Sequence, residues 1–258
     1  MKFCGKSDVG MHRHINQDSY RAMSIWDDKA TLLVVCDGMG GHKAGEIASN
    51  TAVSIFCDKV TASPCEETDK DRILESIRYT LVSAASEANT AILRLAQENE
   101  EYHGMGTTLV AVIIYDGHFY AVNIGDSRFY IVTKEETTLV TKDHSFVQYL
   151  IDNGKLSEEE AKACPRKNVI TRAVGIAEKL DVDFFSAPLS PWENGYLLLC
   201  SDGLSNYTDH TVFEDILFAS SHWFVSQEED LAKKTAALIS FANEKGGSDN
   251  ITAVVARF

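Results

Sequence analysis

Apolar residues in the first hundred positions follow two different periods. An unbroken run of branched aliphatic residues at 31–36 predicts a buried strand. Over 44–59, and again over 71–101, apolar residues recur every three or four positions, which is typical of helices with one buried face. We therefore expect a strand followed by two successive helices.

The stretch 105–133 predicts three strands joined by two turns. Asp116-Gly117 separates the first two strands and is a strong hairpin signal, and Gly125-Asp126 separates the second strand from the third. Strands joined by connections this short are expected to pair antiparallel.

The second half of the chain continues both patterns. It predicts two short helices within 144–163, strands near 181–186 and 195–200, helices near 210–219 and 227–244, and a last strand over 251–257. Strands thus arrive in hairpin order and helices arrive in pairs. This order favours antiparallel sheets covered by helices over a repeated βαβ unit.

Composition narrows the class of protein. The chain has 258 residues, of which 45% are hydrophobic and 24% are charged, as in an ordinary globular domain. Neither a repeat nor a polar linker divides it, so residues 1–258 are expected to form one domain. The net charge of −14, which no basic run offsets, argues against binding to nucleic acid or to an anionic membrane.

The sequence shows no recognisable signal for export. The first ten residues lack the apolar segment of a secretory signal, and the longest apolar stretches have the length of strands. The six cysteines show no paired spacing and no CxxC motif, so we expect reduced thiols. A cytoplasmic protein is the resulting expectation.

Four acids share one local pattern, in which the acid stands at the edge of a predicted strand beside a small residue. They are Asp37, Asp126, Asp202 and Asp249. Any one of them could be ordinary turn chemistry. Together they indicate more, because strand ends converge at one rim of a sheet sandwich. Clustered carboxylates repel unless cations join them, and oxygen ligands suit Mg²⁺ or Mn²⁺. The residues alone therefore predict a metal-dependent hydrolase.

The glycines that follow Asp37 suggest a rival interpretation, a dinucleotide-binding loop. That motif needs G-x-G-x-x-G, and the residue at its last position, counted from Gly38, is Lys43. The spacing therefore excludes the standard nucleotide loop.

Eight segments, in order along the chain, resemble one known family. They are DVGMHRHINQDS (8–19), VVCDGMGGHKAGEIAS (34–49), GMGTTLVAV (104–112), VNIGDSRFY (122–130), KDHSFVQYLIDNGKLSEEEA (142–161), NVITRAVG (168–175), LLLCSDGL (197–204) and SDNITAVV (248–255). Together they resemble the metal-dependent type 2C (PPM) Ser/Thr protein phosphatases in their bacterial form.

The resemblance implies an α+β fold, a four-layer α/β/β/α sandwich. Two antiparallel β-sheets would face each other, flanked by pairs of antiparallel helices, with metals at one end. It also implies a single stand-alone catalytic domain over 1–258, with a flap subdomain at about 142–165 beside the site. The acidic run of the flap, SEEE, would either favour basic substrate segments or simply cap a helix.

Site residues carry over from the resemblance one by one. Asp37 is similar to the acid that bridges two metal ions, and Gly38 to the position whose backbone carbonyl is a ligand. Asp202 and Asp249 resemble ligands of the first metal. Asp126, together with Asp202, resembles the pair that holds a weaker third ion. The implied cofactors are two Mn²⁺ or Mg²⁺ ions and this third ion.

Two further residues complete the implied site. Asp18 matches the acid that acts through metal-bound waters, and Arg13 the cation that grips the substrate phosphate. The implied reaction is hydrolysis of phosphoserine and phosphothreonine by a metal-bridging hydroxide that attacks phosphorus, without a phospho-enzyme intermediate. Phosphorylated proteins are the implied partners, with a cognate Ser/Thr kinase among them, and a monomer suffices.

The sequence departs from the family pattern at Met39, where eukaryotic members carry a histidine proposed as the general acid. His12, His14 and His42 are nearby candidates for that proton, and a metal-bound water is another. A zinc site at His12-x-His14 is conceivable if both lie on one face of a strand, but two histidines are a weak signal.

Other candidates keep two interpretations. Cys36 and Cys200 precede proposed ligands and are either redox-sensitive, if their strands are neighbours, or simple packing residues. Lys43 and Arg172 either assist phosphate binding or support the surface and core.

At the level of function, a catalytically silent phosphoprotein-binding relative and a phosphatase with one dedicated target remain alternatives. The first is disfavoured because each ligand position that can be matched is present.

Overall fold

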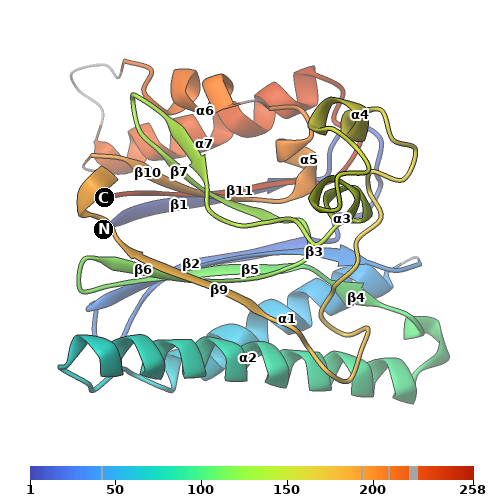
Figure 1. The fold of residues 1–258 in the computed structure, drawn as a ribbon, viewed down its shortest axis with the longest axis horizontal. Helices are drawn as coiled ribbons and strands as arrows, with labels where there is room; N and C mark the ends of the chain where they lie inside the picture. Colours follow the sequence, from blue (N-terminus) through green and yellow to red (C-terminus); the bar gives the residue numbers. More distant parts are fainter. Residues whose placement is uncertain (42, 193, 209, 221–225) are drawn as a thin grey trace.

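The computed structural model describes residues 1–41, 43–192, 194–208, 210–220 and 226–258, which form four layers (Figure 1). Two antiparallel sheets face each other in the middle. Helices α1 (Ala44–Thr61) and α2 (Lys70–Glu98) cover one sheet, and α6 (His210–Leu217) and α7 (Gln227–Glu244) cover the other. This is the predicted α/β/β/α sandwich, so the predicted fold class is confirmed.

The sheet beneath α1 and α2 has six strands. Its order is β2 (Asp18–Ile25), β3 (Ala30–Met39), β5 (Leu109–Tyr115), β6 (His118–Ile124) and β9 (Asp183–Pro188), and the short β4 (Gly106–Thr107) pairs with β3. The run at 32–36 is apolar throughout because β3 is buried on both faces: Leu33 and Val35 lie between the sheets, whereas Leu32 and Val34 pack towards the helices.

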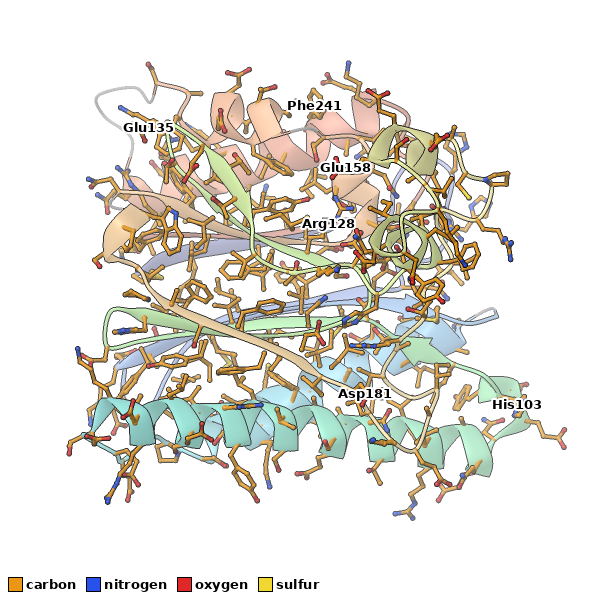
Figure 2. All side chains as sticks on the ribbon, viewed as in Figure 1. His103, Arg128, Glu135, Glu158, Asp181 and Phe241 are labelled. Atoms are coloured by element: carbon orange, nitrogen blue, oxygen red, sulfur yellow. The ribbon has the colours of Figure 1, made fainter. Side chains whose placement is uncertain are left out.

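The second sheet has five strands. Its order is β1 (Lys2–Asp8), β11 (Ile251–Arg257), β10 (Tyr196–Cys200), β7 (Arg128–Val132) and β8 (Thr137–Leu139). Side chains from both sheets fill the space between them (Figure 2). Phe129, Leu197 and Val254 meet Leu33 and Val35 there, so burial on this inner face holds the sandwich together.

The segment predicted as a flap contains the short helices α3 (Phe146–Asp152) and α4 (Glu158–Lys162). Ser157 caps α4 in a capping box with Glu160, so the acidic run here does form a helix N-terminus. At the base of the flap, Arg128 binds Asp143 through two hydrogen bonds of 2.9 and 2.7 Å. Figure 2 shows Arg128 at the end of the sandwich where α3 and α4 lie.

Several elements differ from the prediction. The long helix ends at Glu98 because Asn99 caps a separate 3₁₀ turn, η1 (Glu100–Tyr102), and a second 3₁₀ turn, η2 (Ser190–Trp192), precedes β10. The stretch 105–133 forms β4 in addition to the three predicted strands. The prediction omitted β1, β2 and β8, and Asp202 opens a helical turn, α5 (Asp202–Ser205), rather than lying at a strand edge.

The six cysteines are all free thiols. Cys36 packs in the cluster beneath α1 and α2, whereas Cys200 packs beneath α6 and α7. Their strands therefore belong to different sheets, and the condition set for a redox role, neighbouring strands, is not met. Within the described ranges, no helix combines the length and apolar character needed to cross a bilayer.

Candidate metal centre

A polar cavity of about 280 Å³ opens where β3, β6, β10 and β11 bring their ends together. Six of the seven residues predicted for the site line it: Arg13, Asp37, Gly38, Asp126, Asp202 and Asp249. The seventh, Asp18, is buried and pairs with Asp37 across β2 and β3. The fold thus brings together acids that are more than 200 residues apart in the chain.

The backbone of Asp37 is fixed by two threonines. Its N–H donates to Thr108 Oγ1 over 2.8 Å, and its carbonyl accepts from the Thr108 N–H at 2.8 Å and from Thr107 Oγ1 at 2.9 Å. Because the main chain is held on both sides, the carboxylate at the end of β3 has a defined place at the cavity wall.

Gly38 occupies a position that admits no side chain. A Cβ there would lie 2.0 Å from the Gly45 carbonyl oxygen and 2.6 Å from that of Gln17, and the Gly38 N–H donates to this same Gln17 oxygen over 3.1 Å. The glycine is therefore required by the close approach of β3 to the start of α1.

Asp18 lies behind the cavity wall with its two oxygens in different environments. Oδ2 accepts hydrogen bonds from Ser201 Oγ at 2.7 Å and from Thr252 Oγ1 at 2.6 Å. Oδ1 is buried and accepts no hydrogen bond from any residue that the structure describes. A buried carboxylate oxygen left without a partner is costly, so this atom is suited to bind a cation or a water.

Burial and mutual repulsion raise the pKa of four of the acids. Burial, and after it the neighbouring Asp202, raises the pKa of Asp18 and of Asp126 to about 7. The same two causes hold the pKa of Asp37 and of Asp202 above its usual range. After burial, the largest effect on Asp37 comes from the charge of Asp18, and the largest effect on Asp202 from the charge of Asp249. Divalent cations would reverse this repulsion, so the donor set fits a hard metal.

Two contacts hold acids of the cluster in its present arrangement. Asp202 Oδ2 accepts a hydrogen bond from Asn206 Nδ2 at 3.1 Å. Arg13 Nη2 donates to Asp249 Oδ2 over 2.8 Å. In the part of the chain that the structure describes, no three Asp, Glu, His or Cys side chains are arranged so that they could bind one metal ion without moving. One carboxylate oxygen of Asp202 and one of Asp249 are thus engaged with protein partners in this arrangement.

The remaining candidates lie elsewhere or play other parts. His12 and His14 are exposed in the loop between β1 and β2, so the strand assumed for a zinc site there is wrong. His42 falls outside the described residues. Met39 lines the cavity. Arg172 is ion-paired with Asp183 at 2.9 Å and does not line the cavity.

Sequence reasoning missed the polar residues that support the acids. Ser201 and Thr252 hold Asp18, and Thr108 holds Asp37. Asn250 accepts from the Gln17 N–H at 2.8 Å and donates to the carbonyls of Val9 and Ile15. The available signal was a polar residue inside or beside an apolar strand, next to a predicted ligand.

Comparison with known proteins assigns the family. Residues 11–241 match the profile of the Protein phosphatase 2C family, and the chain belongs to this family. It is 37% identical over 250 residues to the serine/threonine phosphatase stp of Listeria welshimeri, covering 97% of this chain and 93% of that protein.

Solved structures agree in fold. The serine/threonine phosphatase Stp1 of Staphylococcus aureus has a TM-score of 0.88 at 31% identity, covering 100% of this chain and 95% of that one. The catalytic domain of the serine threonine protein phosphatase PstP in complex with two manganese ions has a TM-score of 0.76 at 30% identity, covering 99% and 97%.

Proposed function

We propose that this chain is a cytoplasmic phosphoprotein phosphatase that hydrolyses phosphoserine and phosphothreonine with two Mn²⁺ or Mg²⁺ ions and a weaker third ion. One observation carries the proposal: a polar cavity lined by Asp37, Asp126, Asp202 and Asp249, in which burial and repulsion disfavour the charged forms of the first three unless cations are present. The relatives named serine/threonine phosphatase support the substrate class.

In this proposal the Asp37 carboxylate and the Gly38 backbone carbonyl would hold the two ions together with Asp202 and Asp249. Asp126 and Asp202 would hold the third ion. The two manganese ions bound to PstP support this number of tightly held ions. When bound, the ions neutralise phosphate charge and activate water for direct attack on phosphorus, so no phospho-enzyme forms.

Asp18 and Arg13 act on water and substrate in this scheme. Oδ2 of Asp18 is committed to Ser201 and Thr252, which leaves Oδ1 to accept a proton-bearing partner such as a water molecule. Arg13 is half exposed and donates a hydrogen bond to Asp249 through Nη2, which leaves further guanidinium N–H groups to bind phosphate in this scheme. Met39 cannot donate a proton, so water protonates the leaving alcohol.

The substrates are phosphorylated proteins, with a partner Ser/Thr kinase among them, and the chain acts as a monomer. The domain boundaries are proposed as 1–258, with the flap at about 142–165 controlling access to the cavity. Asn168 and Ile170, which line the cavity just beyond the flap, would then contact substrate.

Hydrolysis of p-nitrophenyl phosphate and of a phosphothreonine peptide tests this function. Asp202→Ala is compared with Asp116→Asn, which removes the charge of another acid that precedes a glycine but does not line the cavity. We expect turnover in Mn²⁺ that EDTA abolishes, that Asp202→Ala loses and that Asp116→Asn keeps. Turnover that survives both EDTA and Asp202→Ala would contradict the assigned site, and no turnover by the folded protein in either metal would favour a binding role.

A further inference from the structure

The turn that carries Asp126 is held from two opposite sides. On one side, a Cβ at Gly125 would lie 2.6 Å from the Thr108 side chain, and Thr108 Oγ1 is 2.7 Å from Ser127 Oγ. Since Thr108 also holds Asp37, this side connects the turn to the centre of the cavity. On the other side the backbone of Gly125 is bound by His144, and its carbonyl also accepts a longer hydrogen bond, of 3.3 Å, from Asn123 Nδ2.

His144 holds Gly125 through both of its backbone groups. The Gly125 N–H donates to His144 Nδ1 over 3.0 Å, and the His144 N–H donates to the Gly125 carbonyl over 2.9 Å. The imidazole is 7% exposed, so water offers little competition for these bonds. The residue that precedes Asp126 is therefore fixed by an interior side chain rather than by the turn alone.

The hydrogen bonds determine the tautomer of His144. Because Nδ1 accepts from a backbone N–H, it carries no proton, so the neutral ring has its proton on Nε2. Nε2 lies 3.1 Å from Asp183 Oδ2 and donates to it. Arg172 Nη1 lies 3.2 Å from Nε2 and donates to Asp183 Oδ1 over 2.9 Å, so both donors share one carboxylate.

Burial also lowers the pKa of His144, which favours the neutral ring that this arrangement requires. Asp183 lies on β9, directly opposite Asn123 of β6, two residues before the turn. The chain of contacts therefore runs from Arg172 through Asp183 and His144 to Gly125, and each member is anchored in the sheet or beside it.

We propose that His144 is a positioning residue for the Asp126 turn, and that it sets how well Asp126 holds its ion. This inference rests on the proposed function, since it takes Asp126 as a metal ligand. His144 touches neither substrate nor ion in this account; it acts only through Gly125. Residues that orient metal ligands in this way typically change affinity by about 10- to 100-fold when removed.

Two substitutions separate the two ends of the imidazole. In His144→Asn the amide oxygen takes the place of Nδ1 and can accept from Gly125, while the contact to Asp183 is lost. In His144→Gln the amide reaches towards Asp183, while the acceptor for Gly125 is lost. Both remove the ring, so a general loss of packing affects them alike, and thermal melting of both variants in EDTA checks that they fold.

Mn²⁺ binding is measured by calorimetric titration of the metal-stripped full chain, with Asp126→Ala as the reference. We expect His144→Gln to weaken the loosest class of Mn²⁺ site by about 10-fold or more, and His144→Asn to retain most of the affinity. Phosphopeptide turnover by His144→Gln should recover at high Mn²⁺, with KM for the peptide little changed.

Three results would overturn the inference. His144→Asn and His144→Gln could weaken Mn²⁺ binding equally, which would show that the Gly125 contact is not what matters. Alternatively, both His144 variants could bind Mn²⁺ normally while Asp126→Ala binds it more weakly. That result would leave the proposed function intact and remove only the role of His144. Asp126→Ala itself could leave Mn²⁺ binding unchanged, in which case the ligand assignment fails and takes this inference with it.

Discussion

Arg13 Nη2 lies 2.8 Å from Asp249 Oδ2, so the residue proposed to grip phosphate is paired with a residue proposed to bind metal. The pair stands at the cavity mouth, where the Arg13 side chain is 52% exposed and that of Asp249 is 30% exposed. In this arrangement the guanidinium supplies part of the positive charge that the acidic cavity lacks. An ion bound at Asp249 would take over that role and release Arg13 for substrate.

Arg13→Ala should therefore impair substrate use with little effect on stability. Loss of a charged hydrogen-bond donor to phosphate is worth about 1.5–3 kcal/mol, which lowers kcat/KM for a phosphothreonine peptide by about 10- to 100-fold. The ion pair itself is exposed and contributes at most about 1 kcal/mol to folding. Arg94→Ala breaks a comparable exposed pair, with Glu98, on α2 and is the control. Equal kinetics for the two variants would contradict the role of Arg13.

Gly38→Ala should disable the site through the backbone. The new Cβ would lie 2.0 Å from the Gly45 carbonyl oxygen, so β3 and the start of α1 must separate. Overpacking of this kind costs about 1–3 kcal/mol of folding stability. It would also displace Asp37, and we expect this displacement to abolish activity in Mn²⁺. Gly41→Ala is the control, because a Cβ there meets no atom within 4 Å. Full Mn²⁺-dependent activity in Gly38→Ala would contradict the claim that the close approach at Gly38 places Asp37.

Asp18→Asn should lower the activity and raise the stability of the metal-free protein. The buried Asp18 carboxylate has an elevated pKa, so its charged form is unfavourable in the metal-free protein at alkaline pH. An amide of the same shape removes that charge, and we expect the melting temperature in EDTA at pH 8 to rise, with a gain of about 1–3 kcal/mol. Activity in Mn²⁺ should fall by about 10-fold or more. A variant that is both less stable and fully active would contradict this account.

The raised pKa values also predict how pH acts on the protein. The pKa values of Asp18 and Asp126 rise from 3.8 to about 7 on folding, so the folded protein binds protons at these two acids more tightly than the unfolded chain does. Their favourable contribution to stability is complete below about pH 4 and is lost as pH rises through about 7. Metal-free protein should lose stability over this window, because the acids become charged without cations.

Mn²⁺ must displace the same protons, so its affinity should rise with pH across that window. Calorimetry in two buffers of different ionisation enthalpy measures the protons released. An affinity that is flat from pH 6 to 8, with no proton release, would show that these acids are already ionised or are not ligands.

Sequence patterns predict the strands and helices whose periods are unambiguous. The last strand was expected over 251–257 and is found there, because each position but the last is buried. β1 is not predicted because Phe3 and Cys4 are adjacent and stand among Lys2, Lys6 and other polar or small residues at a sheet edge. No run or regular period distinguishes such a strand from a loop.

Four acids of the site, Asp37, Asp126, Asp202 and Asp249, could be proposed from the sequence because each stands beside a small residue within two residues of a strand end, whereas Asp18 came only from the family resemblance. Their supporting partners could not. Asp18 is held by Ser201 and Thr252, which are 183 and 234 residues away in the chain. His144 lies 19 residues from Gly125, in a segment that the sequence marks only as the start of a flap. Contacts of this kind depend on how the sheets are stacked, and local patterns do not report that.

The central claim is that the carboxylate cavity holds the ions that act on phosphate. Anomalous diffraction at the manganese edge, from crystals grown with Mn²⁺, tests it most directly. We expect two strong peaks within ligand distance of Asp37, Asp202 and Asp249, about 2.0–2.2 Å by analogy with other hard divalent ions, and a weaker peak beside Asp126. An active, Mn²⁺-dependent enzyme whose crystals show no manganese in this cavity would contradict the account.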